Sequence, residues 1–175
     1  MTARAGETFE TGRAVSDIEA LLAEPVPAAG PTISEEEQVT EEWTVTRGEG
    51  FLIIPLWEGE SLTGVYDPEW NEAVETAEGH LSGLVRELDR RWGTHRKVAM
   101  HVPLFRKQVG EPNLPLFQAL HAVDIYSDLT VWGPVPADGG AARRWVGVSV
   151  GHSDGDAPLV MVAVVSDRPI IELQE

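Results

Sequence analysis

The segment 90–107 carries the side chains best suited to bind an anion. It holds six arginine or lysine residues and no aspartate or glutamate, whereas the whole chain has a formal net charge of −16. Guanidinium, ammonium and imidazolium groups bind phosphate and carboxylate through charge-assisted hydrogen bonds. The candidate anion ligands are His95, Arg96, Lys97 and His101. The alternative interpretation is internal charge compensation, because basic residues are favoured at the end of a helix.

The last histidine of the chain begins a short stretch of candidate metal ligands. His152, Asp154 and Asp156 alternate with small residues, and one imidazole with two carboxylates suits zinc or a harder cation. The same Ser-Asp-Gly-Asp composition is typical of a hairpin turn, because Asp and Gly tolerate its backbone geometry. A turn is therefore the main interpretation and a metal site the alternative. The sequence predicts no cofactor.

A serine-hydrolase pattern occurs without the context that it requires. Residues 147–151 read Gly-Val-Ser-Val-Gly, which matches G-x-S-x-G. That chemistry needs the serine on a sharp turn from a strand into a helix, whereas Ser149 is followed by a turn and another expected strand. The order of serine, acid and histidine also fails, because His152 is the last histidine. We therefore predict no catalytic residue.

Composition argues against several classes of function. The 175 residues include no cysteine, which excludes disulfides, thiolate metal sites and cysteine nucleophiles. The net charge argues against nucleic-acid binding through a general basic surface. No apolar run is long enough to span a bilayer, and the polar start of the chain is unlike a secretory signal. We expect a cytoplasmic protein that binds neither nucleic acid nor membrane, and the excess of arginine over lysine indicates a bacterial chain.

One long amphipathic segment precedes the basic stretch and must help to position it. Asp67 suits a helix start, Pro68 suits the first helical turn, and Gly93 suits the helix end. The apolar residues between them recur at steps of three and four, which places them on one side of a helix. They are Trp70, Val74, Ala77, Leu81, Leu84, Val85, Leu88 and Trp92. We predict one long amphipathic helix over 68–92 that packs on a sheet.

Strand-like runs lie on both sides of this helix. Residues 43–46 and 51–57 read as a hairpin, and residues 97–104 alternate between apolar and other side chains as in a half-buried strand. Three further runs read as an antiparallel meander at 125–135, 144–151 and 158–166. In this meander we expect cross-strand pairing of Val146, Val148 and Val150 with Val160, Val162 and Val164.

These elements predict an α+β fold. The expected core is a single, mostly antiparallel sheet of about five or six strands with the long helix on one face. Short accessory helices are expected over 17–23 and from Pro115 to Leu120. We expect residues 1–33 to form a flexible N-terminal segment that contains the short helix and a Pro-rich connector. Residues 34–175 are expected to form a single α+β domain.

The acidic balance leads to the functional prediction. Residues 34–42 read as a solvated face or a short helix, with an acidic docking patch as the alternative. Six tryptophans are present, and an exposed one among carboxylates would mark a partner surface. We predict a non-catalytic protein–protein interaction module, inhibitor-like, immunity-like or regulatory, with a basic protein partner; a homodimer is left open. The alternative is an enzyme or a small-anion or ligand-binding protein that uses the segment 90–107.

Overall fold

The computed structural model describes residues 8–60, 62, 64, 66–151 and 158–174. In this part of the chain, seven strands form one antiparallel sheet in the order β1-β2-β3-β7-β6-β5-β4. The strands are β1 (Ile33–Glu36), β2 (Trp43–Gly48), β3 (Phe51–Glu58), β4 (Arg96–Val98), β5 (Leu129–Ala137), β6 (Ala142–Gly151) and β7 (Val160–Ser166). The predicted α+β class and single antiparallel sheet are confirmed, with more strands than expected.

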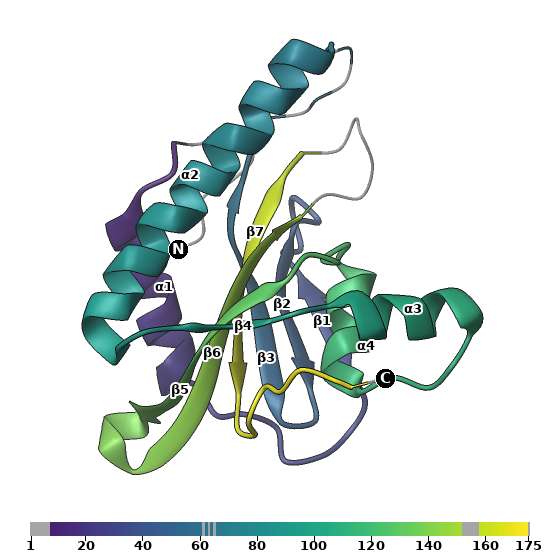
Figure 1. Cartoon of the computed structure of the whole chain (residues 1–175). Coiled ribbons are helices and arrows are strands. Elements are labelled where there is room, and N and C mark those ends of the chain that lie inside the picture. The colour runs from purple at the N-terminus through teal and green to yellow at the C-terminus, as the bar shows by residue number, and fades with distance from the viewer. Residues whose placement is uncertain (1–7, 61, 63, 65, 152–157, 175) are drawn as a thin grey trace.

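Helices cover both faces of this sheet. The described α-helices are α1 (Thr11–Ala23), α2 (Asp67–Trp92), α3 (His101–Val109) and α4 (Pro115–Ala122). Figure 1 shows α1 and α2 on one side of the strands and α3 and α4 on the other. Each side has its own buried apolar cluster. The alternation of side chains along β3 explains this, because Leu52 faces α1 and α2 whereas Phe51 and Ile53 face α4.

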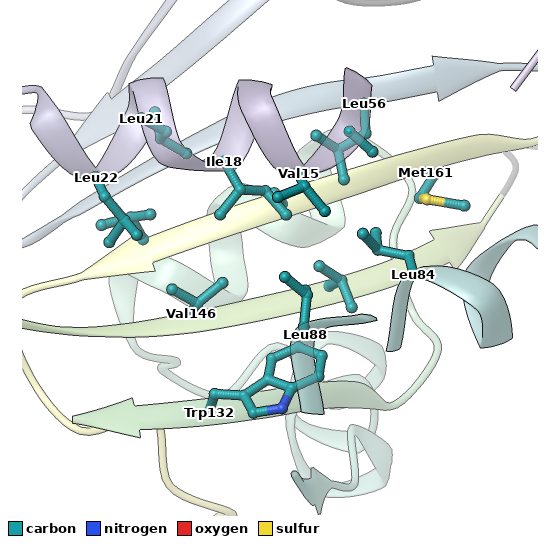
Figure 2. Close-up of a cluster of buried hydrophobic side chains, with 14 of the residues drawn as sticks. Val15, Ile18, Leu21, Leu22, Leu56, Leu84, Leu88, Trp132, Val146 and Met161 are labelled. Atoms are coloured by element: carbon teal, nitrogen blue, oxygen red, sulfur yellow. The ribbon is translucent and has the colours of Figure 1, made fainter. Parts of the chain in front are cut away.

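The long helix α2 is confirmed with the expected start and end. Asp67 and Glu69 lie in its first turn, where carboxylates complement the helix dipole, and Gly93 follows its end with a φ of 88°. Leu84 and Leu88 are fully buried, and Figure 2 shows them pointing toward the sheet near Met161 and Trp132. The first ten residues of α2 include no buried side chain, and this end extends past the strands in Figure 1.

Helix α1 packs on the same face of the sheet as α2. It begins at Thr11, six residues before the start expected from the sequence, because Ala14 and Val15 continue the apolar stripe N-terminally. Figure 2 shows Val15, Ile18 and Leu22 pointing into the cluster that Leu84 and Leu88 complete. α1 thereby contributes buried side chains to the main core.

The predicted strand over 97–104 is wrong beyond Val98. The chain forms the short edge strand β4 and then turns into α3, which ends at Gly110 in the left-handed region. Pro103 lies in the first turn of α3, where a missing N–H costs little. The alternation that suggested a strand is satisfied differently, because Met100 is buried in the cluster that includes α4 and Val102 is buried in the first turn of α3, and neither lies in a strand ladder.

The acidic stretch 34–42 contains an edge strand rather than a helix. All four residues of β1 are exposed, and β1 pairs with β2 along one side only. Arg47 of β2 forms ion pairs with Glu35 and with Glu24 at the end of α1. Carboxylates on an exposed sheet edge discourage pairing with another strand.

The meander β5-β6-β7 is confirmed, but its predicted register is shifted by one residue. Val146, Val148 and Val150 pair with Val165, Ala163 and Met161. Val162 and Val164 instead lie opposite Ser149 and Gly147 and face α4. The reason is that both faces of β7 are covered by helices, so a fully apolar strand does not specify its own register.

Candidate functional site

The four predicted anion ligands do not converge on one site. His95 lies beside a carboxylate, since both its backbone N–H and its Nδ1 are within about 3.0 Å of Asp89 Oδ1. Trp132 Nε1 donates to the same oxygen at 2.9 Å. Burial acts to raise the pKa of Asp89, but the hydrogen bonds from Trp132 and His95 and the charge of His95 outweigh it and lower the pKa. His95 therefore belongs to a structural cluster at the end of α2.

The other three residues point in different directions. Arg96 donates to the carbonyl oxygen of Ile170 in the C-terminal segment, on the α4 side of the sheet. Lys97 Nζ donates to Thr130 Oγ1 at 2.9 Å on the opposite face. His101 is exposed at the start of α3. The strand expected over 97–104 ends at Val98, so His101 begins α3 instead of continuing the strand that follows His95.

The predicted metal ligands cannot be placed. His152, Asp154 and Asp156 lie outside the described residues. Within the described ranges, no group of three His, Asp or Glu side chains is close enough to hold a metal ion.

The serine of the G-x-S-x-G pattern is a core residue. Ser149 is fully buried in β6, and its hydroxyl donates to the carbonyl oxygen of Asp128 at 3.0 Å. A nucleophilic serine needs an exposed hydroxyl on a turn into a helix, and Ser149 has neither the exposure nor the turn.

A cleft with carboxylates along its rim lies between α2 and the ends of β3 and β7. Its volume is about 410 Å³. Trp57, Leu62, Ala73 and Leu159 supply apolar surface, and Glu60, Glu69 and Glu72 supply carboxylates. On the strand side of this cleft, a backbone hydrogen bond from Gly59 to Leu159 at 2.8 Å joins the end of β3 to the start of β7. We call this hollow the acidic cleft.

The apolar wall of the acidic cleft is held by an aromatic cluster. Trp57 is 7% exposed and meets His80 edge-to-face at 5.2 Å between ring centroids. Phe9 stacks on His80 at 4.8 Å and meets Trp57 edge-to-face at 6.2 Å. Burial lowers the pKa of His80, which favours the neutral imidazole against these rings. The position of Trp57 is therefore set by packing from α2 and from the residues before α1.

The rim of the acidic cleft is strongly negative. Between residues 67 and 85, α2 carries five acidic residues and no arginine or lysine. Glu60, Glu69 and Glu72 are all exposed. Tyr66, just before α2, is 79% exposed, and its backbone N–H donates to Glu69 at 3.4 Å. None of the six tryptophans is similarly exposed, so Tyr66 is the exposed aromatic residue among these carboxylates.

This arrangement suits the binding of a cation with an apolar stem. A lysine or arginine side chain can lay its methylene groups on an apolar surface while its charged end meets carboxylates. The described lining includes three glutamates and Thr76 but no serine, histidine or lysine. Sequence reasoning missed this cleft because its lining comes from three separate segments, of which only α2 shows a periodic signal.

A second hollow lies between α3 and α4. It brings Lys107, a basic residue of segment 90–107, close to the buried His121. It has a volume of about 380 Å³, and its lining includes Lys107, Asn113 and His121. Lys107 Nζ donates to Tyr126 Oη at 3.0 Å, and Tyr126 stacks on His121. Burial, and secondarily the charge of Lys107, lower the pKa of His121. The Lys107 ammonium is thus engaged by Tyr126, and the lowered pKa of His121 favours its neutral imidazole.

Comparisons with protein-family models, with curated proteins and with solved structures found no match. In the described part of the chain, none of the helices combines the length and the apolar content needed to cross a bilayer.

Proposed function

We propose that this chain is a non-catalytic protein-binding module, inhibitor-like, immunity-like or regulatory, that holds a basic segment of its partner in the acidic cleft. The observation that carries the proposal is that the apolar side chains of Trp57 and Leu159 line the same hollow as the carboxylates of Glu69 and Glu72. A net charge of −16 adds a long-range attraction for a basic partner, which increases the association rate and favours partners of opposite charge.

The cleft supplies two different contributions to binding. The apolar wall contributes affinity by burying the stem of a lysine or arginine side chain. The carboxylates on α2 select for positive charge, and their attraction weakens as salt increases because they are exposed. Tyr66 adds an exposed aromatic ring next to Glu69, and tyrosine is enriched among the residues that dominate binding energy at interfaces.

The alternative of a small-anion site in segment 90–107 has less support. His95 is engaged by Asp89, and Arg96 and Lys97 lie on opposite faces of the sheet. An anion there would have to replace these existing contacts.

A titration with a synthetic peptide tests the proposal. A fluorescein-labelled peptide of alternating lysine and leucine is titrated with the wild-type chain and with a Glu69→Lys/Glu72→Lys variant. We expect the wild type to bind the peptide, more weakly at high salt, and the variant to bind at least about tenfold more weakly. A glutamate–leucine peptide should not bind the cleft.

Two further variants separate the cleft from general acidity. Glu75→Lys/Glu78→Lys makes the same change in charge on the same helix, at exposed positions outside the cleft lining, and should retain most of the affinity. Thr76→Trp keeps the charge but fills the cleft from an exposed position of α2, and should abolish binding. Equal losses in the two double variants, or full binding by Thr76→Trp, would contradict the proposal.

A further inference from the structure

Helix α3 projects from the molecule with little of its surface covered. Only Val102 and Pro103 of its nine residues are buried. Figure 1 shows α3 extending away from the sheet, beyond α4. A helix of this length is marginal in water without packing of its apolar side. A helix with so little packing would be expected to carry polar side chains on its exposed side, but α3 exposes Phe105 and Val109 there.

Exposed apolar side chains are concentrated on and just after α3. Phe105 is 58% exposed and Val109 is 51% exposed, and they lie one helical turn apart on the same side. Leu114, in the loop that follows, is 46% exposed. Phe105 also lines a hollow of about 320 Å³, together with Val102, Arg106, Glu111 and Gln174. Clustered exposed apolar residues of this kind mark interaction sites on soluble proteins.

The charge of this region is opposite to that of the molecule. α3 carries Arg106 and Lys107 and no acidic residue, and Glu111, which follows the helix, is a carboxylate that lines the same hollow as Arg106. Lys107 is engaged by the hydroxyl and the ring of Tyr126. For the described residues, no ion pair or side-chain hydrogen bond of Arg106 is found. An exposed aromatic ring beside a cation without a carboxylate partner favours a partner that brings both an apolar anchor and a negative charge.

We infer that the α3 surface, formed by Phe105, Arg106, Val109 and Leu114, is a second docking surface that takes an acidic segment with apolar anchors from another protein. The anchors cover Phe105 and Val109, and a carboxylate of the partner pairs with Arg106. This surface lies on the opposite side of the sheet from α2 and is independent of the acidic cleft. The chain would then bind a basic segment on one side and an acidic one on the other.

The test uses a fluorescein-labelled peptide of leucine and glutamate at helical spacing, with a leucine–lysine peptide of the same pattern as its counterpart. We expect the wild type to bind the acidic peptide, and Phe105→Ala and Arg106→Glu each to weaken binding at least about tenfold. Matched controls are Val39→Ala, an 87% exposed apolar residue elsewhere, and Arg90→Glu, an exposed arginine of α2. Both controls should bind like the wild type, and circular dichroism confirms that all variants are folded.

Several outcomes would overturn the inference. One is the absence of acidic-peptide binding up to about 100 μM, the weak end of transient interactions. Another is equal weakening by Arg106→Glu and Arg90→Glu. A third is self-association in sedimentation velocity that Phe105→Ala abolishes, since a second copy would then be the occupant. The cleft variant Glu69→Lys/Glu72→Lys should leave acidic-peptide binding intact, which separates this result from that for the acidic cleft.

Discussion

The Asp89 carboxylate connects three segments through hydrogen bonds. Its Oδ1 accepts hydrogen bonds from His95 and from Trp132, and it links the end of α2 to β4 and β5. Asp89→Ala leaves these donors without their partner. We expect the free energy of unfolding to fall by about 2–4 kcal/mol, measured by urea denaturation.

The matched control is Glu78→Ala, an exposed carboxylate on the same helix. Its effect should stay within about 0.5 kcal/mol, as for most surface substitutions. A similar small effect for Asp89→Ala would mean that water replaces the lost hydrogen bonds at no net cost.

His80 and His121 should make stability depend on pH in the same direction. Burial lowers the pKa of each below its ordinary value of 6.5, with a further contribution from Lys107 at His121. The unfolded chain therefore binds these protons more readily than the folded chain. The contribution of these two histidines to stability is fully present above about pH 6.5 and is lost as the pH falls below that value. Glu58 acts oppositely at lower pH, because burial raises its pKa from 4.5.

We expect the free energy of unfolding to decrease between about pH 7.5 and about pH 5.5, and the decrease to be smaller in a His80→Gln/His121→Gln variant. Urea denaturation at both pH values measures this. An unchanged or larger decrease in the variant would assign the pH dependence to other groups.

At the scale of elements, α2 has one end that stabilises the fold and another that is free to bind. Leu84 is fully buried against the sheet, and Leu84→Ala should cost about 2–5 kcal/mol. Thr76→Ala, at an exposed position near the other end, should be close to neutral. Thermal unfolding of both variants measures the contrast, and similar costs would show that the first turns of α2 are also structural.

The sequence predicted α2, α4 and the β5-β6-β7 meander and failed at residues 98–104 and at β1, for a physical reason. The apolar residues from Val74 to Trp92 recur at helical spacing over several turns, so the helical period fits them and the two-residue period of a strand does not. Residues 98–104 are too few to separate a strand from a helix, since buried Val98 and Val102 are four apart and Val98 and Met100 are two apart. β1 has no buried residue at all, and an exposed strand leaves no apolar pattern in a sequence.

The candidate site was predictable only in part. Glu69, Glu72, Ala73 and Thr76 follow helical spacing and share one side of α2. Leu159 reaches the cleft because β7 pairs with β3, which lies about a hundred residues earlier in the sequence. Local patterns do not specify such a pairing. The four candidate anion ligands are near each other in sequence, but Arg96 and Lys97 lie on opposite faces of the sheet and His101 begins α3.

At the scale of the whole molecule, two exposed aromatic residues lie in surroundings of opposite charge. Tyr66 lies among carboxylates at the start of α2, and Phe105 lies beside arginine and lysine in α3. Most other aromatic side chains are buried or half-buried in the two clusters. The two proposed surfaces therefore differ in charge and lie on opposite sides of the sheet.

The most direct test of the central claim is amide chemical-shift mapping with the lysine–leucine peptide. The account predicts that the largest changes fall on Gly59, Ala73, Thr76 and Leu159 and on the indole N–H of Trp57. Changes spread evenly over the acidic residues of β1 and α2, or none at the cleft, would contradict it.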